Sequence, residues 1–333
     1  MLGTLYIIYI GGHQAFFRLK MPHTIYSKPF KNEDDLIIFL KSKKLPINDE
    51  SKAKKLLKDI SYYRFKSYMH PFKDLNKEFN GSVSFEDIEQ LYRFDDELRD
   101  VFFSIIGRIE IKVRSKLNYV ITKFTNNPYW YLDENLFNSK QNHNKILLTI
   151  SNYFLNSKAD YVKHYQDNYV NDKNNIFKHL PPFWIVGEII MFGELLNICK
   201  NLEKNQFNNR TVNILDELSK EFGALHISEF NKWLILIKAI RNDCAHHSRL
   251  WNNTYFAPRG LVNPMDRLTI RPLNPNRIYA FFTILHIISK KLPLKDVNIY
   301  KTIKDLMQKY PIFDNQKALS GFPTNWDSDP FWH

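Results

Sequence analysis

The chain has 333 residues, of which 44% are hydrophobic and 25% charged, and its formal net charge is +12. These values exclude a chain without a packed core and are typical of a globular protein with more than one domain but fewer than three. The positive charge attracts polyanions, so nucleic acid is the first candidate partner and an anionic membrane surface the second. Because A/T-rich codons also produce a Lys- and Asn-rich chain, the charge by itself does not establish a partner.

No membrane span, metal site or cofactor site is expected from the sequence. The opening run "MLGTLYIIYIGG" and the apolar residues 278–288 are both too short to cross a bilayer. Because a second methionine, Met21, precedes a more usual start, we interpret residues 1–23 as an N-terminal extension. Cys199 and Cys244 have no CxxC neighbour, so we expect buried free thiols in a reducing compartment rather than a zinc site. These features predict a cytoplasmic protein.

Apolar residues at helical spacing and a low glycine content of 10 residues predict an all-α fold. A final pair of helices and an aromatic tail follow an irregular, proline-rich stretch at 256–276. The helices expected before that stretch cover residues 32–43, 50–60, 85–124, 143–170 (one or two helices), 181–202, 211–222 and a helix with its N-cap at Ser228. The expected regions are an N-terminal extension (1–23), an N-terminal helical region (24–80) and a helical core with a helical and irregular C-terminal tail (81–333).

Residues 61–72, "SYYRFKSYMHPF", alternate aromatic and basic side chains. In one interpretation Tyr63, Arg64 and Lys66 contact RNA, because aromatic rings stack on bases and cations hold phosphates. In the other, the aromatic residues form a plug that packs the N-terminal helices onto the core. The sequence leaves both interpretations open. Arg249 is a further candidate contact to RNA.

Charged residues in two of the predicted helices have expected ion-pair partners. Glu110 and Arg114 stand four residues apart in the order that favours an ion pair on a helix. Glu188 lies in the middle of the apolar helix predicted at 181–202, where an unpaired carboxylate is costly. Arg241 is the first candidate partner for Glu188, and Arg114 is the second.

The stretch "RNDCAHHSRLW" begins at Arg241 and follows the apolar run "FNKWLILIKAI". At 100° per residue, Arg241, Asn242 and His246 form one polar wedge at the edge of the buried stripe, while His247 lies on the other side. An arginine can bind a phosphate and the charge that develops on it during transfer, and a histidine can accept or donate a proton. The wedge is therefore a candidate site for phosphodiester chemistry.

The spacing Arg-x(4–6)-His has little weight by itself, because about one such match is expected by chance in a chain with this many Arg and His residues. A structural alternative is that Arg241 pairs with Glu188 while His246 caps the end of the helix.

The longer string "AIRNDCAHHSRLWNN" resembles the Abi-like (AbiD/AbiF-type) family of bacterial abortive infection proteins. The blocks "ISYYRFKSYMHPF", "LYRFDDELRDVFFSIIGRIEIKVRSKL", "YVKHYQDNYV", "LPPFWIVGEIIMFGELLNICKNL" and "GFPTNWDSDPFW" resemble that family in the same order, over about residues 30–333. The family belongs to the HEPN superfamily of all-α proteins. The resemblance implies a HEPN-type helical core and a role in defence against phage.

The resemblance also implies metal-independent RNase chemistry, with the superfamily signature on Arg241, Asn242 and His246. Because HEPN nucleases usually build one cleft from two signatures and this chain has one, it implies a homodimer. The leading hypothesis is an RNase toxin with RNA as substrate. The alternative is a non-catalytic RNA-binding protein, with a regulatory small RNA as its partner.

Overall fold

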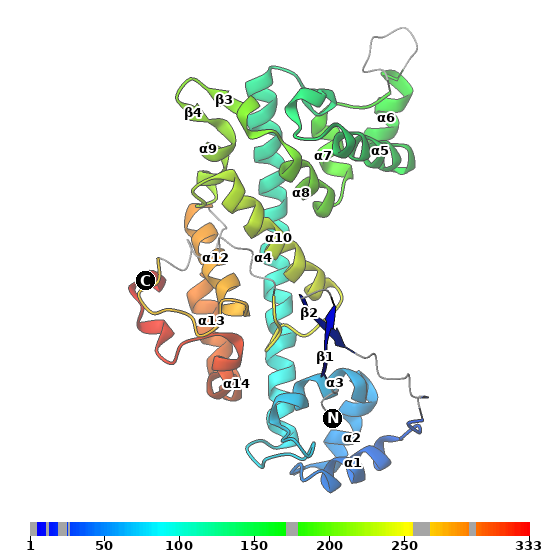
Figure 1. Ribbon diagram of the computed structural model, residues 1–333, viewed down its shortest axis with the longest axis vertical. Coiled ribbons are helices and arrows are strands. Elements are labelled where there is room, and N and C mark those ends of the chain that lie inside the picture. The colour runs from blue at the N-terminus through cyan, green and yellow to red at the C-terminus, as the bar shows by residue number, and fades with distance from the viewer. Residues whose placement is uncertain are drawn as a thin grey trace.

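The computed structural model describes residues 5–10, 13–18, 25, 27–170, 179–255, 267–292 and 298–333 (Figure 1). Most of the described chain is helical, so the predicted all-α class is confirmed. The helices are α1 (Glu33–Ser42), α2 (Glu50–Ile60), α3 (Tyr62–Met69), α4 (Phe85–Thr125), α5 (Lys140–Asn156), α6 (Asp160–Asn168), α7 (Phe183–Ile189), α8 (Phe192–Asn201), α9 (Ile214–Glu221), α10 (Ile227–Ala245), α12 (Ile278–Lys291), α13 (Ile299–Lys309) and α14 (Pro311–Gln316).

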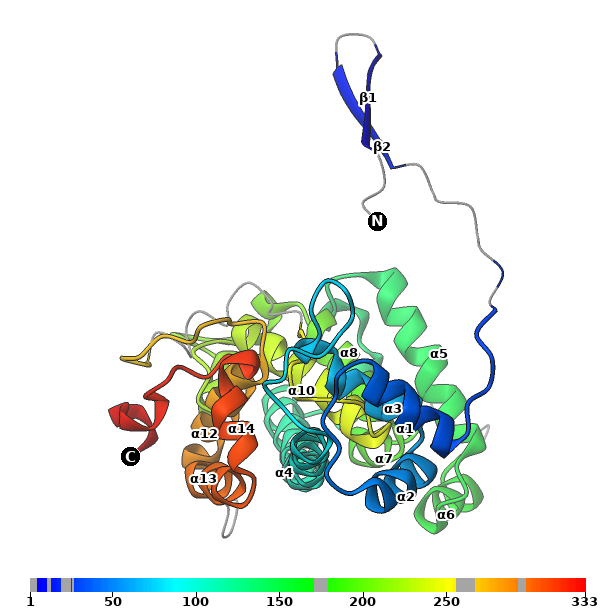
Figure 2. The same ribbon diagram turned by 90° about the horizontal axis from the view of Figure 1, so that it is seen from below.

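Two small antiparallel hairpins add the described strands. One pairs β1 (Leu5–Ile10) with β2 (His13–Arg18), and the other pairs β3 (Asn208–Asn209) with β4 (Val212–Asn213). The first hairpin lies in the region interpreted as an N-terminal extension, and Figure 2 shows it apart from the helical body. Met21 and residues 256–266 of the expected irregular stretch lie outside the described residues.

The helix α4 is the long axis of the molecule. Its first turn is closed by a capping box, in which Ser84 and Asp87 satisfy each other's backbone N–H groups, and it ends at Asn126 in the left-handed conformation. With 41 residues at about 1.5 Å each, it spans roughly 60 Å. Its apolar stripe is buried along the whole length, as the periodicity of the sequence predicted.

The other helices pack along α4 in groups (Figures 1 and 2). The helices α1–α3 pack at its N-terminal end, α5–α8 near its C-terminal end, and α12–α14 along one side. The helix α10 crosses the middle of α4 and also packs on α8, α9 and α12. Cys199 and Cys244 are buried free thiols, as expected. Among the described residues, no helix is long and apolar enough to cross a membrane.

Two local predictions are wrong. The helix expected at 181–202 is broken at Ile190 and Met191, whose extended backbones separate α7 from α8. The N-cap of α10 is His226 and not Ser228, because the His226 imidazole Nδ1 accepts the hydrogen bond from the Glu229 backbone N–H. An imidazole nitrogen can act as the acceptor at this position in place of the usual hydroxyl or carboxylate.

Candidate active site

The candidate site lies at the C-terminal end of α10, where the chain makes a tight turn. His246 is the C-cap, and His247 has a left-handed backbone with φ of 52°. The His247 N–H donates to the Cys244 carbonyl at 3.0 Å and the Ser248 N–H to the Asp243 carbonyl at 2.8 Å, which is the Schellman pattern. The turn leaves the His246 side chain exposed to solvent at the helix end.

Arg241 lies one turn before this end and is held against α4. Its Nε is 3.4 Å from the Glu110 carboxylate, and its guanidinium lies 5.9 Å from the centre of the Phe103 ring. Its Nη1 also donates to the Asn242 side-chain oxygen at 3.5 Å. The arginine side chain remains 39% exposed. Its ion pair is therefore long and partly open to solvent, so an incoming phosphate can compete with the carboxylate.

Glu110 is the carboxylate that faces Arg241. Burial raises its pKa above the ordinary value, and the charges of Arg241 and Arg114 oppose that rise. The predicted Glu110–Arg114 ion pair does not form, because the Arg114 guanidinium instead donates to the Ile190 carbonyl at 3.2 Å. The break between α7 and α8 leaves that carbonyl without a helical donor, and Arg114 supplies one.

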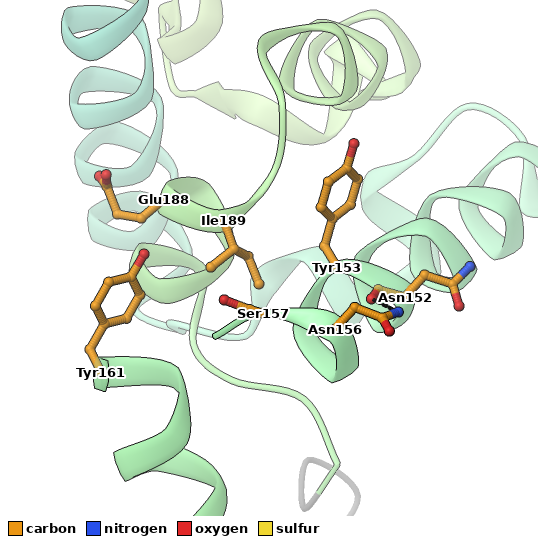
Figure 3. A pocket seen from close by; sticks show the side chains of 7 residues that line it. All are labelled: Asn152, Tyr153, Asn156, Ser157, Tyr161, Glu188 and Ile189. Carbon is orange, nitrogen blue, oxygen red and sulfur yellow. Dashed lines mark hydrogen bonds between the residues drawn. The ribbon is translucent and has the colours of Figure 1, made fainter. Parts of the chain in front are cut away.

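The prediction that Glu188 pairs with Arg241 or Arg114 is wrong. Glu188 is exposed on α7, where it lines a cavity of about 480 Å³ together with Tyr153 of α5 and Tyr161 of α6 (Figure 3). Because the helix ends at Ile189, the residue is not in the middle of a buried apolar helix and needs no buried partner. The structural alternative for Arg241 therefore holds only in part, since its partner is Glu110.

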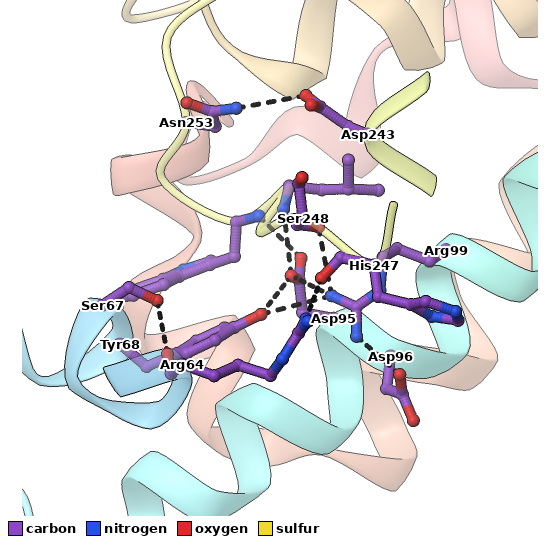
Figure 4. Close-up of polar contacts among 12 residues, drawn as sticks. Arg64, Ser67, Tyr68, Asp95, Asp96, Arg99, Asp243, His247, Ser248 and Asn253 are labelled. Carbon is purple, nitrogen blue, oxygen red and sulfur yellow. Dashed lines mark hydrogen bonds and ion pairs between the residues drawn. The ribbon is translucent and has the colours of Figure 1, made fainter. Parts of the chain in front are cut away.

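The aromatic–basic segment is tied to the turn after α10. The Arg64 guanidinium donates to the His247 carbonyl (Figure 4). The Arg249 guanidinium donates to the Ser67 carbonyl. These reciprocal bonds hold α3 and the turn together. In contrast, Tyr63 is exposed and Lys66 is half-buried. The Lys66 ammonium lies 5.6 Å from the centre of the Tyr63 ring.

Most aromatic residues of the same segment are buried. Phe65, Tyr68 and Phe72 lie in the core, and both Tyr68 and Phe72 stack on Trp251 at about 6 Å between ring centres. The structure therefore supports the interpretation of the segment as a plug for these three residues. Tyr62 is partly buried and packs against the same core, whereas Tyr63 is exposed and takes no part in the plug.

A buried polar network that the sequence analysis missed holds the backbone of Leu250 and Trp251, directly after the turn (Figure 4). The fully buried Asp95 carboxylate accepts hydrogen bonds from the Tyr68 hydroxyl at 2.6 Å and from Arg99 Nη1 at 2.7 Å. It also accepts the backbone N–H groups of Leu250 at 3.0 Å and Trp251 at 2.6 Å. Because both N–H groups belong to residues directly after the turn, this carboxylate fixes where the turn sits on α4.

The same Arg99 side chain reaches the turn itself. Its Nη1 donates to the Ser248 carbonyl at 3.4 Å, and its Nη2 pairs with Asp96. The signal for this network was present in the string "RFDDELRD", where Asp95 and Arg99 stand four apart inside the apolar stripe of a long helix. A charged pair at two stripe positions predicts a buried pair.

Asp243 is a second carboxylate that the sequence analysis missed. Its Oδ2 accepts hydrogen bonds from the Tyr255 hydroxyl at 3.1 Å and the Asn253 amide at 3.3 Å. Burial raises the pKa of Asp243, and these two donors together with His246 oppose the rise. The carboxylate thus joins the end of α10 to the chain that leaves the turn.

The described fold and this site define an all-α protein that presents an Arg–Asn–His set at the exposed end of a helix. A family model for Abi-like proteins matches residues 55–252, which is more than half of the chain. The chain therefore belongs to the Abi-like protein family, and this membership supports a role in abortive infection, a defence against phage. No curated protein and no solved structure matches the chain.

Proposed function

We propose that this protein is a metal-independent endoribonuclease of the HEPN type that acts as an abortive infection effector. The observation that carries the proposal is that a half-exposed Arg241 and an exposed His246 lie five residues apart at the C-terminal end of α10. Asn242 follows Arg241 in the chain, and its side-chain oxygen accepts a hydrogen bond from the arginine. Arg241 binds the phosphate, His246 moves a proton, and Asn242 orients the arginine.

RNA supplies its own nucleophile, so the protein needs to supply position and proton transfer. The ribose 2′-OH attacks the adjacent phosphorus, the bond to the 5′ oxygen of the next nucleotide breaks, and a 2′,3′-cyclic phosphate and a 5′-OH form. One base takes the proton from the 2′-OH, and one acid gives a proton to the leaving oxygen on the opposite side. DNA lacks the 2′-OH and is not cleaved.

Two histidines on opposite sides of the phosphorus suit this reaction, which favours a homodimer with two facing wedges. The surface of α4 beside Arg241 has features that favour such a contact. Phe103 is 47% exposed and Ile111 is 65% exposed on this helix, so both offer apolar surface to a second chain. A Cβ added at Gly107, between them on α4, would meet no atom within 4 Å, so a second chain can approach closely there.

The mechanism uses no metal ion. Among the described residues, no group of three or more His, Cys, Asp or Glu side chains is placed to hold one. Addition of excess EDTA to the cleavage assay tests this part of the proposal, and we expect cleavage to persist. Cleavage that requires Mg²⁺ or Mn²⁺, or that leaves a 3′-OH end, would contradict the mechanism.

The main experiment compares the unchanged protein with the variants Arg241→Ala and His246→Ala. It measures growth arrest of the cells that express each protein and cleavage of RNA by each purified protein. We expect both variants to remain folded and to lose both activities. Loss of the group that transfers a proton, or of the group that binds the phosphate, lowers the rate of cleavage by about 10²-fold or more. The matched control is His247→Ala, which we expect to keep most of the activity.

A mixing experiment tests the shared cleft. Light scattering should give about twice the chain mass of 39.8 kDa. A mixture of Arg241→Ala and His246→Ala chains tests whether the cleft is shared. Each mixed cleft contains one arginine and one histidine, which neither variant has by itself, so we expect cleavage to recover in part, below that of the unchanged protein with its two histidines. A fully active monomer would refute the composite site. RNA binding without any cleavage by the unchanged protein would favour a non-catalytic, small-RNA-regulated protein instead.

A further inference from the structure

A separate cavity of about 420 Å³ lies between α1, α3 and the segment before α1. Its walls are apolar and aromatic, with Leu36 and Phe39 from α1 facing Tyr62 and Tyr63 from α3. Tyr63 is 75% exposed, although a large aromatic side chain normally finds cover. A cavity of this size accommodates a small planar group.

Three lysines surround the same cavity: Lys28, Lys31 and Lys66. No carboxylate is among the described residues that line it. Lys31 and Lys66 instead rest over the rings of Phe39 and Tyr63, each with its ammonium 5.6 Å from the ring centre. Three like charges around one opening repel each other, and an anion bound between them relieves this repulsion.

We propose that this cavity binds one nucleotide unit of single-stranded RNA. The base enters the aromatic cleft and stacks on Tyr63, and the adjacent phosphates bind the three lysines. Aromatic walls with cations at the rim match this ligand, which is flat and apolar on its faces and anionic at its backbone. The match is independent of base identity, so the cavity accepts RNA of any sequence.

The position of the cavity links it to the candidate active site. The helix α3 presents Tyr63 and Lys66 to the cavity, while Arg64 donates to the carbonyl of His247 at the end of α10. One short, packed helix therefore connects the bound nucleotide to the turn that carries His246. In this respect the inference rests on the proposed function, because the RNA held in the cavity is the same polymer that the wedge cleaves.

The test measures binding separately from cleavage. The probe is a short, labelled single-stranded oligoribonucleotide with 2′-O-methyl groups, which blocks the nucleophile, and the readout is fluorescence anisotropy at several salt concentrations. We expect Tyr63→Ala to weaken binding about tenfold, as loss of a base stack does. We expect Lys66→Ala to weaken it and to lower the salt slope by about one. Because both side chains reach the surface, the melting temperature should stay unchanged.

The matched control is Lys58→Ala, an exposed lysine of α2 outside the cavity that makes the same change of charge. Equal affinities of Tyr63→Ala, Lys66→Ala and the control would refute the inference. So would displacement of bound probe by an acidic peptide at concentrations where unlabelled oligonucleotide has no effect. If the unchanged protein does not cleave RNA but Tyr63→Ala still weakens binding of the oligoribonucleotide, the proposed catalysis is refuted and the nucleotide-binding site is supported.

Discussion

Removal of the Asp95 carboxylate should be among the most damaging single changes in this protein. The carboxylate is fully buried and accepts hydrogen bonds from four donors, which belong to Tyr68, Arg99, Leu250 and Trp251. Asp95→Ala leaves a buried guanidinium without its buried partner and two backbone N–H groups without acceptors. Loss of one partner of a buried ion pair costs about 3–5 kcal/mol, and each stranded backbone group adds to that cost.

We therefore expect Asp95→Ala to lower the free energy of unfolding by at least about 4 kcal/mol, against a total of about 5–15 kcal/mol for a protein of this kind. Tyr68→Phe removes only one donor to the charged group, so it should cost about 1.5–3 kcal/mol and keep the stack on Trp251. Asp96→Ala is the matched control. Its carboxylate pairs with Arg99 from a half-exposed position, so its loss should cost less than about 1 kcal/mol.

Urea unfolding followed by circular dichroism measures these differences. Since Asp95→Ala can fail to fold, Tyr68→Phe provides the functional test. In the folded Tyr68→Phe protein, the amides of Leu250 and Trp251 should exchange with solvent faster, and RNA cleavage should fall because the turn after His246 is less firmly held. If Asp95→Ala is as stable as Asp96→Ala, the carboxylate does not hold the turn and the reasoning is wrong.

Two further outcomes follow from the structure. His247→Gly should keep RNA cleavage and raise the free energy of unfolding by up to about 1 kcal/mol, because glycine suits the left-handed C′ position. A loss of cleavage comparable with that of His246→Ala would give His247 a catalytic role. Burial lowers the pKa of His286 from its ordinary value of 6.5 to about 4. The stability that the neutral imidazole contributes is therefore fully present above pH 6.5 and is lost as the pH falls toward 4, by about 2 kcal/mol near pH 5. Chemical denaturation over that range should show a shallower loss in His286→Phe, and an equal slope in the two proteins would contradict the assignment.

The sequence by itself determined the features that depend on neighbours along one helix. The caps and apolar stripe of α4 and the spans of α1 and α2 follow from residues within a few turns of each other. The relation of Arg241 to Asn242 is also local, because both lie near the end of one helix at 100° per residue, and His246 follows directly as the C-cap of that helix. This local geometry is what made the wedge predictable as a candidate site.

Only the tertiary structure decided which groups meet across helices. Arg241 has Glu110 as its partner, because α10 crosses α4 where Glu110 lies. Glu188 is not its partner, because this residue is exposed on α7. Asp95 reaches Leu250 across 155 positions of the chain, a contact to which no local pattern points. Side-chain periodicity fixes which face of a helix is buried but not which partner covers it, because that choice depends on how all the buried faces pack at once.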